Sequence, residues 1–391
     1  MSGKAIILAV VKREIERIKH NRAYQFLLLI GPLIGISIIF AIFYKGAVRE
    51  LPIAVVDQDH SSLSIKIGNA INASADVDVV LHAHDLFQAK QILEKGEIEA
   101  IVLIPSETEK NVYSDIEAPI PLYINGTNVL KASLIQRSVV TSVKTLSAGV
   151  QLKKLILQGK TEKEAMSRII PVGVEKHVLF NPYTNYNYFL GSAMLFVMLI
   201  LFIVLSSTYT LGNELKRGTG IDLLNTANNS VRMAVVGKLL PYTIIFTGFA
   251  MLIDYLLYIV DVMPMNGNYI ILFIGQFIMI VTYQLMGLIF IGATSNLRLA
   301  LSIVSAYSMM SITFSGLTFP LGYMPKIAQA FGAIFPFTWW EKLLISQSFR
   351  GAPLDEALPY ILYMLIFQVI AILFLKVYKK HLGDPVYWGK S

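Results

Sequence analysis

The chain has 391 residues, of which 55% are apolar and only 15% are charged, and its mean hydropathy is +0.59. Soluble domains carry roughly a quarter charged residues, so this composition excludes an ordinary soluble enzyme. The net charge is +7. In a membrane protein such an excess is typical of basic cytoplasmic loops, and we expect no nucleic-acid partner. Because the sequence has no cysteine, it excludes disulfides and thiolate metal sites.

Long gaps between charged residues indicate where the chain can cross a membrane. A spanning helix needs roughly 20 predominantly apolar residues. The gaps predict six spans, near residues 24–44, 187–212, 239–260, 269–295, 299–319 and 358–377. The first apolar stretch is too long for a signal peptide, so we interpret it as an uncleaved anchor. The fold class is therefore an α-helical polytopic membrane protein with six transmembrane helices, helices 2–6 lying within residues 186–378.

Loop charges predict the orientation. Lys and Arg gather in residues 1–23, in the loop 213–238 and in the tail 379–391, whereas the opposite short loops hold few. By the positive-inside rule, these basic segments and both termini are cytoplasmic.

Residues 45–185 differ from the rest of the chain because they are rich in charges of both signs. Alternating apolar residues and short apolar runs predict strands and helices in turn. The expected strands are 53–56, 77–81, 100–104 and 120–124, and the expected helices are 62–73, 85–97 and 129–158. We interpret this segment as an extracytoplasmic α/β domain inserted between helices 1 and 2.

Two further segments are expected to touch the membrane without crossing it. In residues 5–19, the apolar side chains Ile7, Val11, Ile15 and Ile18 share one helical face, which predicts an amphipathic helix along the cytoplasmic surface. Residues 320–350 are apolar but interrupted by proline, and Trp339 and Trp340 favour the headgroup level. They predict an outer re-entrant region.

No pattern in the sequence predicts catalysis. Gly159-Lys160-Thr161 ends like a phosphate-binding loop, but Lys154 replaces the required first glycine, so a helix C-terminus is the better interpretation. We therefore expect no cofactor on this chain. His82 and His84 would face one side of a strand and leave a metal site open as an alternative to an exposed polar face.

Asp254 is the only acidic residue inside a predicted span. Such residues face the bundle interior and are functional candidates. Asp254 also lies near the outer end of its span, so its carboxylate could instead reach outer-leaflet water. Both interpretations remain open from the sequence.

One cytoplasmic segment has a familiar pattern. Residues 213–219, Asn-Glu-Leu-Lys-Arg-Gly-Thr, are followed by Leu223, Leu224 and Thr226. This resembles the coupling segment of ABC-2 type exporter permeases of the large-ectodomain branch, although Ile221 and Ala227 depart from the family's acid and proline. Residues 53–61 resemble the start of that branch's outer domain, and 315–325 with Pro336 its re-entrant region.

The resemblance implies a permease subunit that exports amphiphilic small molecules or lipids across the bacterial cytoplasmic (inner) membrane. It implies a cytosolic ABC ATPase that carries ATP and Mg, a second permease subunit (the same chain or a close paralogue), a periplasmic adaptor protein and membrane lipids as partners. Alternatives are a multi-span surface receptor or scaffold, an ion-gradient-driven transporter, or an intramembrane enzyme, which the absence of histidine from the spans disfavours.

We assign coupling and transport to two groups of residues. In the coupling loop, Glu214 is expected to pair with Arg217 or with a basic residue of the ATPase, Gly218 to have a positive φ, and Thr219 to cap a short helix. The coupling group is Glu214, Lys216, Arg217, Gly218, Thr219, Asp222, Leu223 and Leu224. The translocation group is Asp254, Phe314, Phe319 and Pro320.

Overall fold

The computed structural model describes residues 2–170, 174, 176–182 and 184–389. The chain forms two compact units. One is helical and combines Met1–Gly46 with Val178–Ser391, and the other is an α/β unit of Ala47–His177. The predicted tail ends at residues 390 and 391, and the predicted α/β segment includes 171–173, 175 and 183; all of these lie outside the described residues.

Six helices of the described chain are long and apolar enough to cross a membrane, which confirms the predicted number. Three of them include a short π-helical segment. The six are α2–η1–α3 (Arg22–Gln25, Phe26–Ile30, Gly31–Phe43), η2–α9 (Asn187–Gly191, Ser192–Lys216), α11–η3 (Val231–Asp254, Tyr255–Val260), α12 (Tyr269–Thr294), α13 (Leu297–Phe314) and α16 (Leu354–Gly383).

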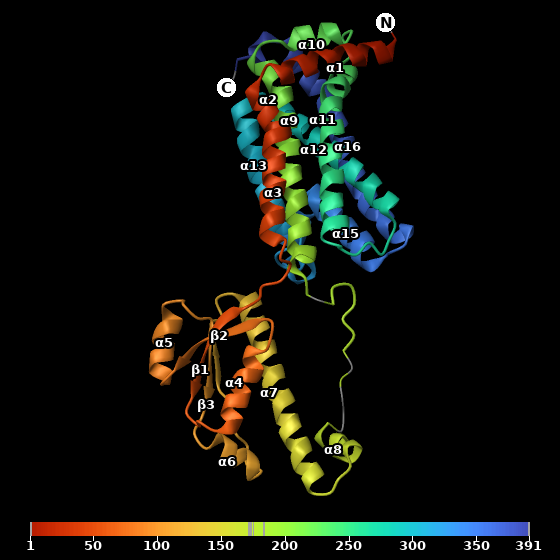
Figure 1. Ribbon diagram of the computed structural model, residues 1–391. Helices are drawn as coiled ribbons and strands as arrows, with labels where there is room; N and C mark the ends of the chain where they lie inside the picture. Colours follow the sequence, from red (N-terminus) through yellow and green to blue (C-terminus); the bar gives the residue numbers. More distant parts are fainter. Residues whose placement is uncertain (1, 171–173, 175, 183, 390–391) are drawn as a thin grey trace. The chain divides into compact units, whose positions relative to one another are not determined.

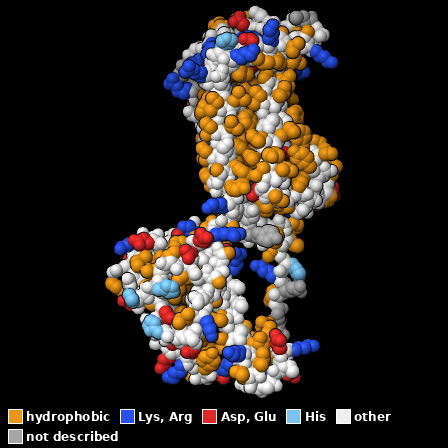
Figure 2. Space-filling model, viewed as in Figure 1, with side chains coloured by type: hydrophobic (Ala, Val, Ile, Leu, Met, Phe, Trp, Pro, Cys, Tyr) orange, Lys and Arg blue, Asp and Glu red, His pale blue; other side chains and the backbone are white. Residues whose placement is uncertain are grey.

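The helices α9 and α12 form the centre of the helical unit. They are the most buried of the six, and Phe196, Leu199 and Ile203 of α9 are fully enclosed. The other spans expose many apolar side chains, and Figure 2 shows this apolar surface along the side of the unit. Such a surface is suited to lipid or to another membrane subunit.

One end of the helical unit carries the amphipathic helix α1 (Gly3–Lys19), the short helix α10 (Gly220–Thr226) and both chain ends (Figure 1). Helix α1 confirms the predicted element, but its buried residues are Ile6, Val10 and Glu14, one position away from the predicted apolar face. The register differs because Glu14 is bonded into the protein interior. The structured tail adds the 3-10 turn η6 (Pro385–Tyr387) after α16.

The opposite end carries short helices between α13 and α16, where the re-entrant region is predicted (Figure 1). Trp339 stacks on Tyr363, with ring centroids 4.0 Å apart. Trp340 is fully buried and meets Phe196 edge to face, so its ring packs inside the helical unit. These helices are η4 (Leu321–Tyr323), α14 (Lys326–Gly332), α15 (Pro336–Ile345) and η5 (Ser346–Arg350).

The α/β unit has a four-stranded sheet in the order β2-β1-β3-β4 within its described residues, parallel except for β4. Alternate residues of β1 face opposite layers: Ile53 and Val55 pack toward α4 and α7, Ala54 and Val56 toward α5. Its elements are β1 (Leu51–Asp57), α4 (Ser62–Asn72), β2 (Val77–Ala83), α5 (Leu86–Glu94), β3 (Ala100–Ile104), α6 (Thr108–Tyr113), β4 (Leu122–Ile124), α7 (Val129–Leu157) and α8 (Glu162–Ile169).

Candidate functional site

A buried cluster of charges lies where α1, α9 and α11 meet, at the end of the unit that also carries α10. Glu214 of α9 and Lys238 of α11 are completely buried, and Glu14 of α1 nearly so. The Lys238 ammonium donates to Oε2 of Glu14 at 2.5 Å and to Oε1 of Glu214 at 2.7 Å. One lysine thus joins two carboxylates from different helices.

Two arginines of α1 complete the cluster. Arg13 forms a two-pronged pair with Glu214, Nη1 to Oε1 at 2.7 Å and Nη2 to Oε2 at 3.0 Å. Arg17, one helical turn further on, reaches Oε1 of the same carboxylate at 2.5 Å. Burial acts to lower the pKa of Arg13, but the bond and charge of Glu214 raise that pKa above its ordinary value. Glu214 is therefore held by three cations.

The second carboxylate, Glu14, has neutral partners as well. Its Oε1 accepts from the Thr210 hydroxyl at 2.5 Å and from the Tyr242 hydroxyl at 2.7 Å. Buried charges are tolerated where they are paired and hydrogen-bonded, and removing one partner of such a group typically costs about 3–5 kcal/mol. The cluster therefore fixes α1 against α9 and α11.

The turn after α9 is joined to the same cluster. Gly218 has a φ of +66°, as predicted. Thr219 does not cap α10 through its side chain; that prediction is wrong, because its hydroxyl donates to Oε2 of Glu214 at 2.5 Å and accepts from Arg17 at 2.9 Å. The predicted pairing of Glu214 with Arg217 is also wrong, since Arg217 is exposed.

The predicted coupling residues divide into an inner and an outer set. Leu223 and Leu224 are buried against the protein's own helices, together with Glu214. The outer set of the predicted residues is exposed and consists of Lys216, Arg217 and Asp222. The structure adds the exposed Ile221, which was not predicted, and we call these four residues the outward face. Of the predicted coupling residues, those of the outward face are the ones whose side chains are exposed. Gly218 and Thr219 connect the two sets as the turn between α9 and α10.

The C-terminal tail packs on this turn. The Gly389 amide donates to the carbonyl of Leu215 at 3.1 Å. A Cβ added to Gly218 would lie 3.2 Å from the ring of Trp388. The tail therefore covers the turn between α9 and α10. The sequence analysis does not predict this contact between the tail and the turn.

Sequence reasoning also missed four members of the cluster: Arg13, Glu14, Arg17 and Lys238. Charged residues are taken as the ends of spans in the sequence, so one predicted span ends at 212 and the next begins at 239. In the structure α9 continues to Lys216 and α11 begins at Val231, because the buried charges are paired. The available signal was the combination of Glu14 on a basic helix with Lys238 in an apolar run.

The predicted translocation residues have different surroundings. Asp254 is buried, and its carboxylate accepts from the Tyr269 hydroxyl at 2.8 Å and from Gln276 at 2.6 Å, both on α12. This geometry favours the interior position over outer-leaflet water. Phe314, at the end of α13, packs against Phe331 of α14, and the centroids of the two rings are 4.9 Å apart.

Phe319 and Pro320 lie in the connection between α13 and η4. The Phe319 side chain is exposed, and Pro320 directly precedes η4. Asp254 thus bonds to α12, whereas Phe314 packs against Phe331 of α14. Their role in transport stays a prediction.

The α/β unit gives no support to a metal site. His82 and His84 are exposed at the end of β2. Among the described residues no group of three or more His, Asp or Glu could hold a metal ion. Gly159 follows the end of α7 with a φ of +84°, as a helix C-terminus requires.

The family comparison agrees with this arrangement of helices. No curated protein sequence matches the chain. The sequence model of the ABC-2 family transporter proteins matches residues 22–375, from the first span almost to the end of the last. Permeases of this family are membrane components that work with an ATPase partner. The chain, with its six candidate membrane helices and this match over most of its length, belongs to the ABC-2 family of transporter proteins.

Proposed function

We propose that this chain is the membrane-spanning permease subunit of an ATP-driven exporter. ATP and Mg are bound and hydrolysed by a separate cytosolic ABC ATPase. The observation that carries the proposal is the linkage of Glu214 to Arg13, Arg17 and Lys238. A displacement of the turn after α9 is transmitted to α1 and α11 through these short, buried ion pairs.

The outward face is the proposed ATPase contact. It combines two cations, one carboxylate and the apolar side chain of Ile221 on the exposed side of α10 and its preceding turn. Mixed charges with a central apolar residue suit a specific protein contact. Because Leu223 and Leu224 face inward, they anchor α10 to the permease and do not touch the partner.

The orientation follows from this contact. The end of the helical unit that carries α1, α10 and both chain ends is cytoplasmic, and its Lys and Arg side chains are visible in Figure 2. The α/β unit is then extracytoplasmic and available to a periplasmic adaptor. The exposed apolar surface of the spans is available to a second permease subunit and to lipid.

The proposed cargo is an amphiphilic small molecule or a lipid, moved out of the cytoplasm or the inner leaflet. The spans offer aromatic and methionine side chains, whereas Asp254 is the one carboxylate among the described residues of 239–260. Such walls favour apolar cargo with few charges.

Purification in mild detergent followed by identification of co-purifying chains tests the proposal. We expect an ABC ATPase, and we expect Arg217→Ala with Ile221→Ala to lower its recovery and the substrate-stimulated ATP hydrolysis. Lys4→Ala, at an exposed position at the start of α1, is the matched control and should behave as wild type.

Two outcomes would contradict the proposal. Transport that follows the proton gradient and resists vanadate would favour an ion-gradient-driven transporter. Recovery of the chain without an ATPase, with a ligand bound to the α/β unit, would favour a receptor or scaffold.

A further inference from the structure

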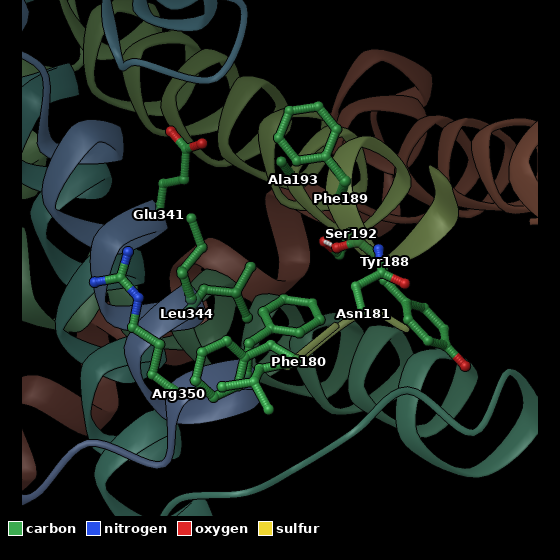
Figure 3. Close-up of a pocket in the computed structure, with 12 residues that line it drawn as sticks. Phe180, Asn181, Tyr188, Phe189, Ser192, Ala193, Glu341, Leu344 and Arg350 are labelled. Carbon is green, nitrogen blue, oxygen red and sulfur yellow. Dashed lines mark hydrogen bonds between the residues drawn. The ribbon is translucent and has the colours of Figure 1, made fainter. Parts of the chain in front are cut away.

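A cavity of about 260 Å³ lies within the helical unit, at the end opposite the charged cluster. Its walls come from the segment before η2, the start of α9, α15 and η5 (Figure 3). Phe180, Tyr188, Phe189 and Phe349 supply aromatic surface. The cavity is therefore mostly apolar, which makes its two charged residues conspicuous.

The first charged residue is Glu341 of α15. Its side chain lines the cavity and is only 6% exposed. Its Oε2 atom is buried and has no hydrogen-bond partner among the described residues. Ser315 hydrogen-bonds to the same carboxyl group and the charge of Lys342 acts on it, but within the described chain no hydrogen bond reaches Oε2, and the Lys342 ammonium lies 4.6 Å from the ring centre of Trp339. A buried acceptor without a partner is costly, so this position favours a ligand that brings an N–H donor.

The second charged residue is Arg350, at the end of η5. It lines the same cavity but is exposed. In Figure 3 it lies on the same side of the cavity as Glu341, with Phe189 and Ser192 opposite. Within the described chain, Arg350 forms no ion pair with Glu341. One cavity therefore presents a deep negative charge and a positive charge nearer to its mouth.

Apolar side chains continue from the cavity to the outer surface. Leu179, Phe180 and Phe189 line the cavity and are also exposed. A ligand whose polar head fills the cavity could therefore lay an apolar tail across them. The cavity volume equals roughly nine water molecules at about 30 Å³ each, which suits a small headgroup but not an acyl chain.

We propose that this cavity binds the headgroup of a zwitterionic phospholipid that carries a free ammonium, of the phosphatidylethanolamine type. The ammonium donates to Glu341, the phosphate meets Arg350, and the acyl chains lie over Leu179, Phe180 and Phe189. In such a lipid the phosphate stands between the ammonium and the chains, which is the order of the cavity's groups from its interior outward.

The geometry also predicts selectivity. A phosphatidylcholine headgroup has the same charges but no N–H, so it leaves Oε2 of Glu341 without a donor. Phosphatidylglycerol has no cation at all. A charge-assisted hydrogen bond contributes about 1.5–3 kcal/mol, so phosphatidylethanolamine should bind about tenfold or more tightly than either.

Native mass spectrometry of the purified, delipidated full chain tests this. The chain is titrated with the three phospholipids bearing identical acyl chains, without ATPase or nucleotide. The measurement is thus independent of the proposed export function. Glu341→Gln should remove the preference for phosphatidylethanolamine over phosphatidylcholine. Arg350→Gln should weaken both by a similar factor. Glu356→Gln, an exposed acid on the first turn of α16, is the control and should keep the preference.

Three results would overturn the proposal. The first is equal binding of phosphatidylethanolamine and phosphatidylcholine by the unchanged chain. The second is an unaltered preference in Glu341→Gln that elutes as a single species on size exclusion; if that variant aggregates, Glu341→Asp, with its carboxylate drawn back, must weaken the preference instead. The third is soluble phosphoethanolamine competing as well as the lipid, because the acyl chains would then contribute nothing.

Discussion

Glu14 and Lys238 are 224 residues apart in the chain, yet the Lys238 ammonium lies 2.5 Å from the Glu14 carboxylate. Both side chains are buried. The pair connects the amphipathic helix α1 to α11 in the protein interior, where neither side chain is exposed to solvent. Since Lys238 also bonds to Glu214, α1, α9 and α11 share one set of charges. Movement of one helix relative to the others must therefore break or shift these bonds.

Lys238→Met should destabilise the helical unit strongly. Methionine keeps the length and the apolar stem of lysine but leaves Glu14 and Glu214 buried without their shared cation. Breaking a buried pair in this way costs about 3–5 kcal/mol. The measurement is the melting temperature of the purified chain in detergent. Lys12→Met, at an exposed position of α1, is the control and should melt near the wild-type temperature.

A double variant separates pairing from packing. Glu14→Gln combined with Lys238→Met removes one of the two uncompensated carboxylates, so it should be more stable than the sum of the single effects predicts. Strict additivity of the two single changes would contradict the pairing that the structure has at this position.

The sequence predicts the spans better than it predicts the cluster, for a physical reason. Apolar length is a local property, so gaps such as 269–295 locate α12 within a residue or two. Charge pairing depends on residues far apart in the chain. Lys238 therefore looks like the end of a loop in the sequence, although in the structure it lies inside α11.

For the same reason, only part of the candidate site can be predicted from the sequence. The positive φ of Gly218 follows from a local pattern and is confirmed. The partners of Glu214 and the packing of Trp388 on the turn depend on tertiary contacts, and no local rule indicates them. The predicted pairing of Glu214 with Arg217 rests on helical spacing. In the structure, Arg13 and Arg17 of α1 bind the Glu214 carboxylate instead.

Asp254→Asn should assemble normally but change transport if Asp254 belongs to the translocation pathway. Asparagine keeps the size and can still exchange hydrogen bonds with Tyr269 and Gln276, because the hydroxyl and the amide can each reverse their roles. Only the charge is lost. Export across a panel of amphiphiles, alongside the yield of assembled complex, provides the measurement. Unchanged export of every compound would remove Asp254 from the pathway.

The α/β unit should lose stability in acid partly through Asp76. Burial acts to raise the pKa of Asp76, but bonds from Ser138 and Arg137 of α7 hold it below its ordinary value of 3.8. A lowered folded-state pKa contributes stability that is complete above the ordinary value and is lost as the pH falls through the lowered one. Thermal melts of residues 47–177 between neutral pH and strong acid should therefore be less steeply pH-dependent in Asp76→Asn.

The exposed Asp78 provides the control for that comparison. Asp78→Asn should keep the acid sensitivity of the unchanged unit, because Asp78 lies on the outer face of β2. The same melts test whether the unit folds alone, as its own two apolar clusters predict. A coil-like circular dichroism spectrum at neutral pH would contradict that expectation.

Gly218→Ala should weaken coupling more than assembly. The φ of +66° is costly for alanine, by about 1–2 kcal/mol, and the added Cβ would press on the ring of Trp388 at 3.2 Å. The turn can relax only by shifting Thr219 or the tail, which disturbs the bonds of Glu214 to Arg17 and Thr219. We therefore expect normal membrane insertion, a modest fall in melting temperature and a large loss of substrate-stimulated ATP hydrolysis by the co-purified ATPase. Gly383→Ala is the matched control, because a Cβ there meets nothing within 4 Å. If Gly218→Ala retains the coupled activity of Gly383→Ala, the turn does not transmit movement and the proposed coupling role is wrong.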